Sequence, residues 1–237
     1  MIQTLNHVYT GDCRDLIEDG VDLMCREGLT PVVVTDPPFN VGYHYDGYGD
    51  RMGRTEYMSM LVLVTSLTPS VVIHYPEQLH ALSVAKREVP RRVVSWVYNS
   101  NTAKQHRDIA FYAVSPDFRR VKQPYKNPND KRIQKRIAEG KGARLYDWWE
   151  VNQVKNVAKC KTAHPCQMPL EVMKRVIGVL PDGIGVIEPY SGSGTTLVAC
   201  KELGIPFIGY EIVPEYAEIT RARLADCESK EVDDGSR

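Results

Sequence analysis

The stretch Val32-Val33-Val34-Thr35-Asp36-Pro37-Pro38-Phe39-Asn40 joins a β-branched run to a carboxylate, two prolines and an aromatic ring. The run from Val32 to Thr35 predicts a buried parallel strand. The two prolines end that strand, because they fix the backbone and cannot donate a hydrogen bond to a neighbouring strand. Asp36 to Phe39 therefore lie at the carboxyl end of a strand, which is where open α/β sheets bind their ligands.

These residue types suit chemistry on an amino group. The Asp36 side chain and the Pro37 carbonyl can each accept one N–H of a planar amine, so that the nitrogen lone pair turns towards an electrophile. Phe39 can stack on the ring that bears the amine, as aromatic side chains do on extruded bases. This predicts a catalytic site of Asp36, Pro37, Pro38 and Phe39. The alternative for so short a motif is an ordinary loop with a capping aspartate.

A second strand–turn–helix unit lies near the end of the chain. A strand over 183–188 runs into Pro189-Tyr190-Ser191-Gly192-Ser193-Gly194-Thr195-Thr196, which opens a helix over 197–203, and a strand over 206–211 follows. This order is typical of a cofactor site, with Glu211 nineteen residues after Gly192 at the position of a ribose-binding acid. Because a third glycine at GxGxxG spacing is missing, an adenosine cofactor without phosphates fits better than a dinucleotide, with Glu188 facing its amino-acid end.

Length and composition set broad limits. The 237 residues suit one large domain, or one domain with an insertion. No apolar run approaches the roughly 20 residues that span a bilayer, and no signal peptide is visible at the N-terminus. We therefore expect a cytoplasmic protein without membrane contact. The six cysteines include Cys160 and Cys166 near His164, but their spacing matches no standard zinc pattern, so we expect reduced thiols and no metal.

Charge is uneven although the formal net charge is zero. Residues 115–161 hold 13 basic and 5 acidic residues, which gives this segment +8 and the remainder −8. A basic segment on an acidic body favours a polyanionic partner. Poor periodicity predicts an insertion outside the sheet, and a solvated, partly helical surface is the alternative. The basic candidates for contacting DNA are Arg119, Arg120, Lys122, Lys126, Lys131, Arg132, Lys135 and Arg136.

Further strands are predicted over 6–9, 71–74, 93–97 and 109–114. Asp12 follows the first of them. It either caps the next segment, a common role for aspartate, or lines the same crevice as Asp36. The loop 41–54 contains four glycines, three tyrosines and two arginines. It is either a lid that closes over a substrate or a solvated surface loop.

Taken together, these blocks resemble the amino-group DNA methyltransferases of the beta permutation class. The resemblance covers nearly the whole chain: 11–13, the Asp-Pro-Pro-Phe motif, His164-Pro165-Cys166-Gln167-Met168-Pro169-Leu170, the glycine-rich unit and 207–211, in the permuted order. It implies a mixed seven-stranded Rossmann-like sheet with helices on both faces, ordered as the strands at 6, 206, 184, 32 and 71, with those at 93 and 109 beyond. The catalytic domain would comprise 1–114 and 162–226, with 115–161 as the target-recognition segment and 227–237 as a flexible tail.

The resemblance also implies S-adenosylmethionine as cofactor, with Asp12 at its adenine, Glu211 at its ribose, and Gly192 and Gly194 making room for its methionine portion. Three positions depart from the family, which usually has Asp at Glu188, Tyr at Phe39 and Lys at Met168. The implied cofactor residues are Asp12, Cys13, Asp36, Gln167, Glu188, Tyr190, Ser191, Gly192, Ser193, Gly194, Thr195, Thr196 and Glu211. Asn40 and Tyr43 join the basic residues as candidates for contacting DNA.

The predicted function is therefore methyl transfer to the N6 amine of adenine in duplex DNA by base flipping, with a homodimer possible. Cytosine N4 is the first alternative, since its chemistry is the same, and RNA is a weaker alternative as substrate. A catalytically silent DNA- or cofactor-binding module is an alternative from another class. The missing third glycine disfavours a nicotinamide oxidoreductase.

Overall fold

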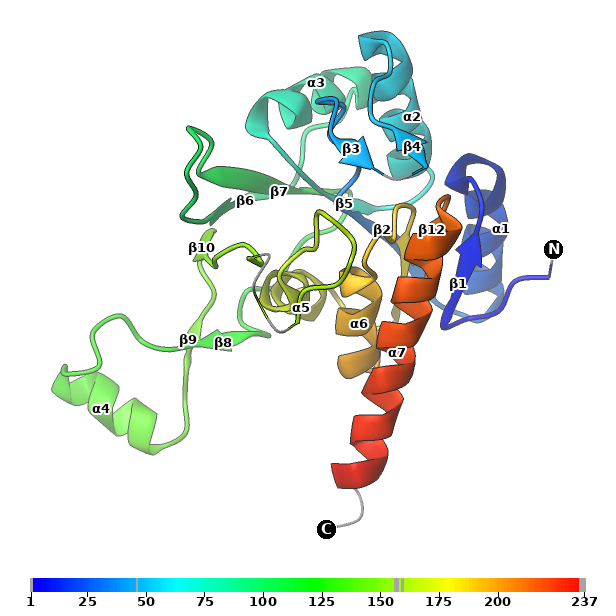
Figure 1. The fold of residues 1–237 in the computed structure, drawn as a ribbon. Helices are drawn as coiled ribbons and strands as arrows, with labels where there is room; N and C mark the ends of the chain where they lie inside the picture. The colour runs from blue at the N-terminus through cyan, green and yellow to red at the C-terminus, as the bar shows by residue number, and fades with distance from the viewer. Residues whose placement is uncertain (1, 46, 156–157, 159, 235–237) are drawn as a thin grey trace.

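The computed structural model describes residues 2–45, 47–155, 158 and 160–234, with side chains as far as Cys227. Its centre is an eight-stranded mixed sheet (Figure 1). In spatial order the strands are β1 (His7–Thr10), β12 (Phe207–Glu211), β11 (Ile184–Glu188), β2 (Thr30–Thr35), β5 (Ser70–His74), β7 (His106–Tyr112), β6 (Arg92–Val97) and β10 (Trp148–Glu150). The first five are mutually parallel, and β7 runs antiparallel to both of its neighbours. The predicted strand order is confirmed.

The prediction of seven strands is wrong by one, because β10 pairs in parallel with β6. Residues 115–161 therefore do not lie wholly outside the sheet. Trp149 points into the core and is 1 % exposed, whereas its neighbour Trp148 is 42 % exposed. The Trp96 indole N–H also donates to the Val151 carbonyl at 2.7 Å. The three residues of β10 are too few to show the alternation of apolar and polar residues that predicts a strand.

Helices cover both faces of the sheet, as predicted. On one face lie α1 (Cys13–Arg26), α2 (Arg54–Ser66) and α3 (Pro76–Lys86), and on the other lie α5 (Leu170–Gly178), α6 (Thr195–Glu202) and α7 (Pro214–Asp234). Side chains alternate along β2: Val33 packs with α1 and α2, while Val32 and Val34 pack with α5 and α6. α7 runs to Asp234, so the described part of 227–237, which was predicted to be a flexible tail, is helical. None of the described helices is long and apolar enough to cross a membrane.

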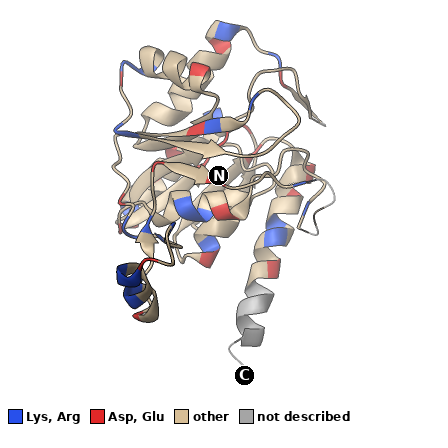
Figure 2. Cartoon of the chain, turned by 90° about the vertical axis from the view of Figure 1, so that its left-hand side faces the viewer, with Lys and Arg blue, Asp and Glu red and all other residues tan. Residues whose placement is uncertain are grey.

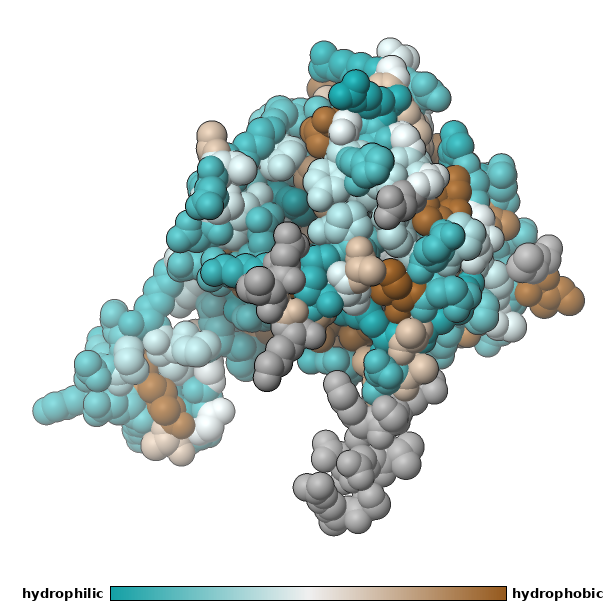
Figure 3. All heavy atoms as spheres, viewed as in Figure 1, coloured by the Kyte–Doolittle hydropathy of each residue, from teal (hydrophilic) through white to brown (hydrophobic). Residues whose placement is uncertain are grey.

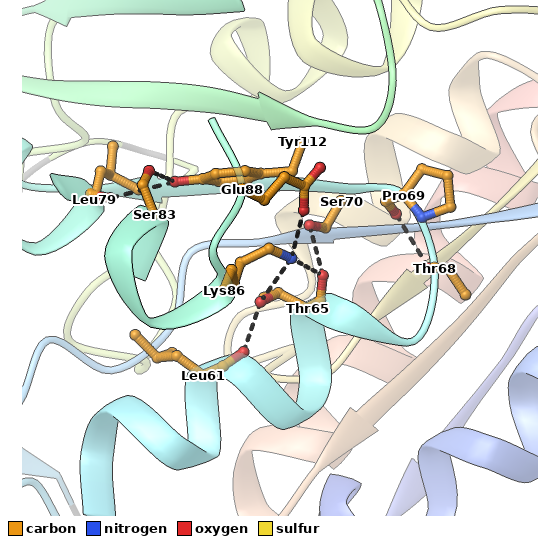
Figure 4. Close-up of polar contacts among 10 residues, drawn as sticks. All are labelled: Leu61, Thr65, Thr68, Pro69, Ser70, Leu79, Ser83, Lys86, Glu88 and Tyr112. Atoms are coloured by element: carbon orange, nitrogen blue, oxygen red, sulfur yellow. Dashed lines mark hydrogen bonds and ion pairs between the residues drawn. The ribbon is translucent and has the colours of Figure 1, made fainter. Parts of the chain in front are cut away.

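A buried lysine joins α2, α3 and the start of β5 (Figure 4). The Lys86 side chain is 2 % exposed, donates to the Thr65 carbonyl at the end of α2 and lies 3.5 Å from Glu88. Ser70 donates to the same Thr65 carbonyl at 2.9 Å, and the Lys86 ammonium lies over the Tyr112 ring. These contacts supply donors for the carbonyls at a helix end, where the helix itself offers no further N–H. They fix β5 in place, and His74 at the end of β5 belongs to the site described below.

Residues 122–144, the part of the basic segment from β8 to β9, form an arm that stands away from the main sheet (Figure 1). Its base is the two-stranded pair β8 (Lys122–Gln123) and β9 (Ala143–Arg144), and its far end is α4 (Lys131–Ala138). No residue of α4 is buried. Lysine and arginine crowd this helix (Figure 2). A small apolar stripe is visible on the arm (Figure 3), and Ile137 of α4 is 45 % exposed.

Candidate functional site

A cavity of about 280 Å³ lies at the carboxyl ends of β1, β2, β11 and β12. It brings together most of the predicted site residues from both halves of the chain, so the two motifs share one crevice. The eight basic candidates for contacting DNA lie outside its lining, and so do Asn40, Gln167 and Gly194. The predicted residues that line it are Asp12, Cys13, Asp36, Pro37, Pro38, Phe39, Tyr43, Glu188, Tyr190, Ser191, Gly192, Ser193, Thr195, Thr196 and Glu211.

Asp36 is held by a residue that the sequence did not single out. Arg107, on β7, places Nη1 3.5 Å from Asp36 Oδ2, and the two side chains are 15 % and 16 % exposed. Asp36 Oδ1 and Arg107 Nε are both buried, and neither has a hydrogen-bond partner among the described residues. Burial raises the pKa of Asp36 to about 6, against the charge of Arg107, which lowers it. Asp36 thus keeps one unused acceptor, and it is not the N-cap of any described helix.

The Phe39 ring is already in contact with two groups. It stacks on His74 with ring centroids 4.2 Å apart, and the Arg107 guanidinium lies 4.6 Å from its centroid. His74 is 1 % exposed, and burial lowers its pKa to about 3. The prediction that Phe39 offers a face for stacking therefore requires the guanidinium to shift.

A hydrogen-bond chain fixes the Pro-Pro bend from behind. The Tyr75 amide donates to His74 Nδ1 at 2.7 Å, so the other ring nitrogen, Nε2, carries the proton and donates to the Tyr57 hydroxyl, also at 2.7 Å. Tyr57 in turn donates to the Pro38 carbonyl at 2.7 Å. Helix α2 and strand β5 thereby set the position of the loop that follows Asp36.

The segment after Phe39 folds over the cavity around one buried carboxylate. Asp50 is 4 % exposed and accepts backbone N–H bonds from Asn40, Val41 and Tyr43 at 2.8, 3.1 and 2.9 Å. The Asn40 side chain pairs with both backbone groups of Met52, at 2.7 and 3.0 Å. A short hairpin, β3 (His44–Tyr45) and β4 (Tyr48–Gly49), spans the segment.

This lid segment, residues 40–52, is not a solvated loop: Val41, Tyr43, Tyr45, Tyr48 and Met52 all line the cavity. Both polar atoms of the Asn40 side chain are hydrogen-bonded to Met52 within the lid segment, so fewer hydrogen-bonding positions remain for a contact with DNA than the sequence suggested.

Glu188 lies at the floor of the cavity with its carboxyl group satisfied. It accepts from Thr35 and Thr196 at 2.7 Å each and from the Tyr190 amide at 3.1 Å, and it is 2 % exposed. Burial raises its pKa to about 8, although these three donors lower it. Where the family usually has aspartate, this chain therefore has a longer, buried carboxyl group, which links β2 to the start of α6 through Thr35 and Thr196.

The glycines of the glycine-rich turn make room for protein side chains. A Cβ at Gly192 would lie 2.9 Å from His164 Nε2, and a Cβ at Gly194 would lie 2.5 Å from the Thr220 methyl group. Both residues have positive φ, 51° and 75°. The prediction that they admit a ligand to the backbone is thus only part of the reason for glycine here.

Two further acids lie where the sequence placed them. Glu211, at the end of β12, accepts from the Gly192 and Val213 amides at 2.7 and 2.9 Å, and the Ile212 amide also acts on it, which leaves part of the acceptor capacity of the carboxylate unused. Asp12 caps α1 by accepting from the Arg14 amide at 2.9 Å, and the Arg14 guanidinium binds the same carboxylate. Hydrogen bonds from Arg14 hold the pKa of Asp12 below its usual range. The capping role of Asp12 is confirmed, and Asp12 also lines the cavity.

Gln167 braces its own loop. Its amide accepts from the Thr162 N–H at 2.8 Å and donates to the Cys160 carbonyl at 2.9 Å, which explains why it does not face the cavity. Cys160 is exposed, and the described residues contain no group of three potential ligands placed to hold a metal ion.

The basic candidates fall into two groups. Arg119 and Arg120 form exposed ion pairs with Asp117 and Asp182. The others stand on the arm, where Lys126 lies 4.6 Å from the Trp148 ring and Arg136 lies 5.7 Å from the Tyr125 ring. Basic and aromatic side chains are therefore interleaved along the arm, at a distance from the cavity.

Known proteins are similar to this chain in sequence and in fold. The N6/N4 DNA methylase family matches residues 30–222, which is most of the sequence. The chain belongs to this family. The Type II methyltransferase M.BglII of Bacillus subtilis is 26 % identical over 254 residues, which cover 92 % of this chain and 68 % of that protein.

Two solved DNA methyltransferases share the fold. The M1.HpyAVI complex with S-adenosylmethionine has a TM-score of 0.59 at 21 % identity and covers 92 % of this chain and 98 % of that one. The cytosine-N4-specific PvuII methyltransferase has a TM-score of 0.60 at 13 % identity and covers 91 % and 85 %. The Rossmann-like methyltransferase fold expected from the sequence is thus confirmed.

S-adenosylmethionine is the cofactor of this methylase family, and the cavity fits such a group. Glu211 offers free lone pairs beside the glycine-rich turn, and the buried Tyr190 hydroxyl has no hydrogen-bond partner within the described part of the chain. The volume of about 280 Å³ lies just below the roughly 300–1,000 Å³ that is typical of small-molecule sites.

The sequence did not reveal Arg107, which lines the cavity, nor Asp50, Tyr57 and His74, which support the cavity wall through hydrogen bonds. Arg107 and His74 lie on paired strands but are far apart along the chain, and no local pattern marks such a contact. Asp50 lies in a glycine-rich stretch where a solvated aspartate is ordinary.

Proposed function

We propose that this DNA methylase transfers a methyl group from S-adenosylmethionine to the exocyclic N6 amine of adenine in duplex DNA. The observation that supports this best is the buried Oδ1 of Asp36, which no described residue hydrogen-bonds; Asp36 directly follows β2 and precedes Pro37 in the chain. It lies in the same cavity as the glycine-rich turn. An acceptor pair facing a cofactor site is what an amine needs to attack an electrophilic methyl group.

The cofactor residues are assigned by where they lie. Glu211 would accept from the ribose hydroxyls with its free lone pairs, and Asp12 would lie at the adenine. Residues 190–193 with 195 and 196 would line the methionine portion, and Cys13 packs beside them. Glu188 would act through the Thr35 and Thr196 hydroxyls that it already binds.

The chain's own groups then position the reaction. When bound, S-adenosylmethionine supplies a methyl carbon on a positively charged sulfur, which leaves as a neutral thioether. Asp36 and the Pro37 carbonyl hold the two amine protons so that the nitrogen lone pair points along the line of attack. The nitrogen becomes acidic as the N–C bond forms. It then loses one proton, which passes to solvent by way of the Asp36 carboxylate. Asp36 therefore need not be a strong base.

DNA would be held by the arm and the base extruded into the cavity, at a cost of a few kcal/mol. The +8 charge of residues 115–161 supports phosphate contacts by Arg119, Arg120 and the basic residues of the arm. Tyr43 is 44 % exposed at the mouth of the cavity and suits a contact with the flipped nucleotide. The possible homodimer stays a prediction from the resemblance.

Cytosine N4 is the second candidate, because its amine is adjacent to a ring nitrogen just as in adenine. Asp at position 36 favours adenine by resemblance to the family. Transfer of labelled methyl to unmethylated duplex DNA, followed by digestion to nucleosides, tests both. Label in N6-methyladenine is the expected result. Label in N4-methylcytosine alone would show that the substrate base is cytosine and not adenine. No transfer to DNA or RNA, with S-adenosylmethionine still bound, would favour a silent module.

A further inference from the structure

The Asp36–Arg107 pair carries one unused acceptor and one unused donor. Asp36 Oδ1 and Arg107 Nε are buried, and no described residue hydrogen-bonds either atom, while the two side chains approach each other through Oδ2 and Nη1 at 3.5 Å. Buried polar groups are normally hydrogen-bonded, so two such atoms in one ion pair indicate a missing ligand. Both residues line the cavity.

Arg107 is seated so that its guanidinium can move a short way without leaving the site. Its partner across the sheet is Trp96, and the guanidinium lies 5.4 Å from that ring and 4.6 Å from the Phe39 ring. Its approach to the Met168 sulfur, at 3.6 Å, is weak. None of these contacts anchors Nε.

The Oδ1 and Nε pair is complementary to an amine that lies beside a ring nitrogen, an edge that adenine presents and that cytosine shares. The 6-amino group of adenine is a donor, and the adjacent ring nitrogen N1 is an acceptor. An acceptor next to a donor is therefore complementary to this edge. Guanine and thymine present a carbonyl and a ring N–H there, which would face Asp36 and Arg107 with the wrong polarity.

We propose that Arg107 is a base-selecting residue that donates to N1 of the extruded adenine while Asp36 accepts from the 6-amino group. This rests on the proposed function. On base entry the guanidinium leaves the face of Phe39 and lies beside the base, so the ring becomes free for stacking. His74 does not make this room, since both of its ring nitrogens are hydrogen-bonded and it is buried.

The competing explanation gives Arg107 only an electrostatic role, in which its charge supports Asp36 and touches no base. Substituting the base separates the two. 1-Deazaadenine replaces N1 by C–H and keeps the amine, so it removes the acceptor that Arg107 would use. A matched control is Arg92→Met. Arg92 belongs to the neighbouring strand β6, and its guanidinium also lies over an aromatic ring, that of Phe118, but Arg92 does not line the cavity.

The experiment first maps the methylated site on DNA, then measures single-turnover methylation of a duplex that carries adenine or 1-deazaadenine at the target. For wild type and Arg92→Met, kcat/KM is expected to fall about tenfold to a hundredfold with the deaza base, the range of one base-edge contact. For Arg107→Met the fall is expected to be less than about twofold, because this variant has no donor to N1. Arg107→Lys, which keeps a donor, is expected to retain part of the penalty.

Altered pairing of the deaza base cancels in this comparison, since every enzyme form meets the same duplex. An equal penalty in wild type and Arg107→Met overturns the proposal. A wild type that is inactive on adenine overturns the proposed function instead; if the label lies in cytosine, 3-deazacytosine is the corresponding probe. If Arg107→Met is inactive, the same ratio is measured as equilibrium affinity for the two bases placed opposite an abasic site.

Discussion

Arg107 Nη1 lies 3.5 Å from Asp36 Oδ2, so a strand that enters the sheet antiparallel supports the carboxylate of the Asp-Pro-Pro-Phe loop. Burial raises the pKa of Asp36 to about 6, and Arg107 lowers it. The other titratable groups coupled to this carboxylate are Glu188, Cys166, Tyr45, Tyr57 and Tyr98. The proposed reaction uses the ionised carboxylate of Asp36, because its negative charge stabilises the positive charge that the amine acquires as the N–C bond forms.

The first prediction follows from this pKa. Because the folded-state pKa is raised, the active carboxylate is present above about pH 6 and is lost as the pH falls through that value. A pH profile of kcat/KM should therefore show an acidic limb near pH 6. Arg107→Met should move the limb to higher pH, whereas Arg107→Lys should leave it close to wild type. An unmoved limb in Arg107→Met would mean that Arg107 does not act on Asp36.

Gly192 and His164 form a close pair whose disruption should be partly reversible. A Cβ at Gly192 would lie 2.9 Å from His164 Nε2, at a φ of 51°. Gly192→Ala should therefore weaken S-adenosylmethionine binding by about tenfold or more, measured by calorimetry, through distortion of the turn. Gly192→Ala combined with His164→Ala should recover part of the affinity, the remaining deficit being backbone strain. No recovery at all would show that the ring is not what excludes a side chain.

Asp50 should control the lid segment. Removing its carboxylate in Asp50→Ala leaves three backbone N–H groups without their acceptor, at a cost of about 1–3 kcal/mol in the free energy of unfolding. Hydrogen exchange should rise within residues 40–52, and the KM for DNA should rise with it. The exposed Asp22→Asn on α1 is the control and should change neither. Unchanged exchange in 40–52 would remove Asp50 from this role.

The arm should contribute DNA affinity without contributing to folding. Replacing Lys131, Arg132, Lys135 and Arg136 by glutamine should weaken DNA binding and flatten its salt dependence, by about one unit of log–log slope for each phosphate that the variant no longer neutralises. The melting temperature should hold, since no residue of α4 is buried, and S-adenosylmethionine affinity should hold as well. If the fourfold variant kept the wild-type salt dependence of DNA binding, the DNA-binding surface would lie elsewhere.

Local patterns were enough to predict the strand ends and the crevice, whereas the order of the sheet followed from the family resemblance. The β-branched run before Asp36 and the glycine-rich turn after Glu188 each mark a strand end, and ligand chemistry concentrates at such ends. The short strand β10 was missed because three residues carry too little periodicity. Arg107 and His74 were missed because their roles depend on which strands become neighbours across the sheet. The glycines were understood only in part, since His164 and Thr220 fill the space that a side chain would need.

The most direct test of the central claim is the N6-methyladenine content of genomic DNA, measured by mass spectrometry in a bacterial host without adenine methylases of its own. Expression of the wild-type chain should produce N6-methyladenine. Asp36→Ala, expressed to the same level and binding S-adenosylmethionine as wild type does, should reduce it at least about a hundredfold. Full methylation by Asp36→Ala would contradict the assignment of this cavity as the site of methyl transfer.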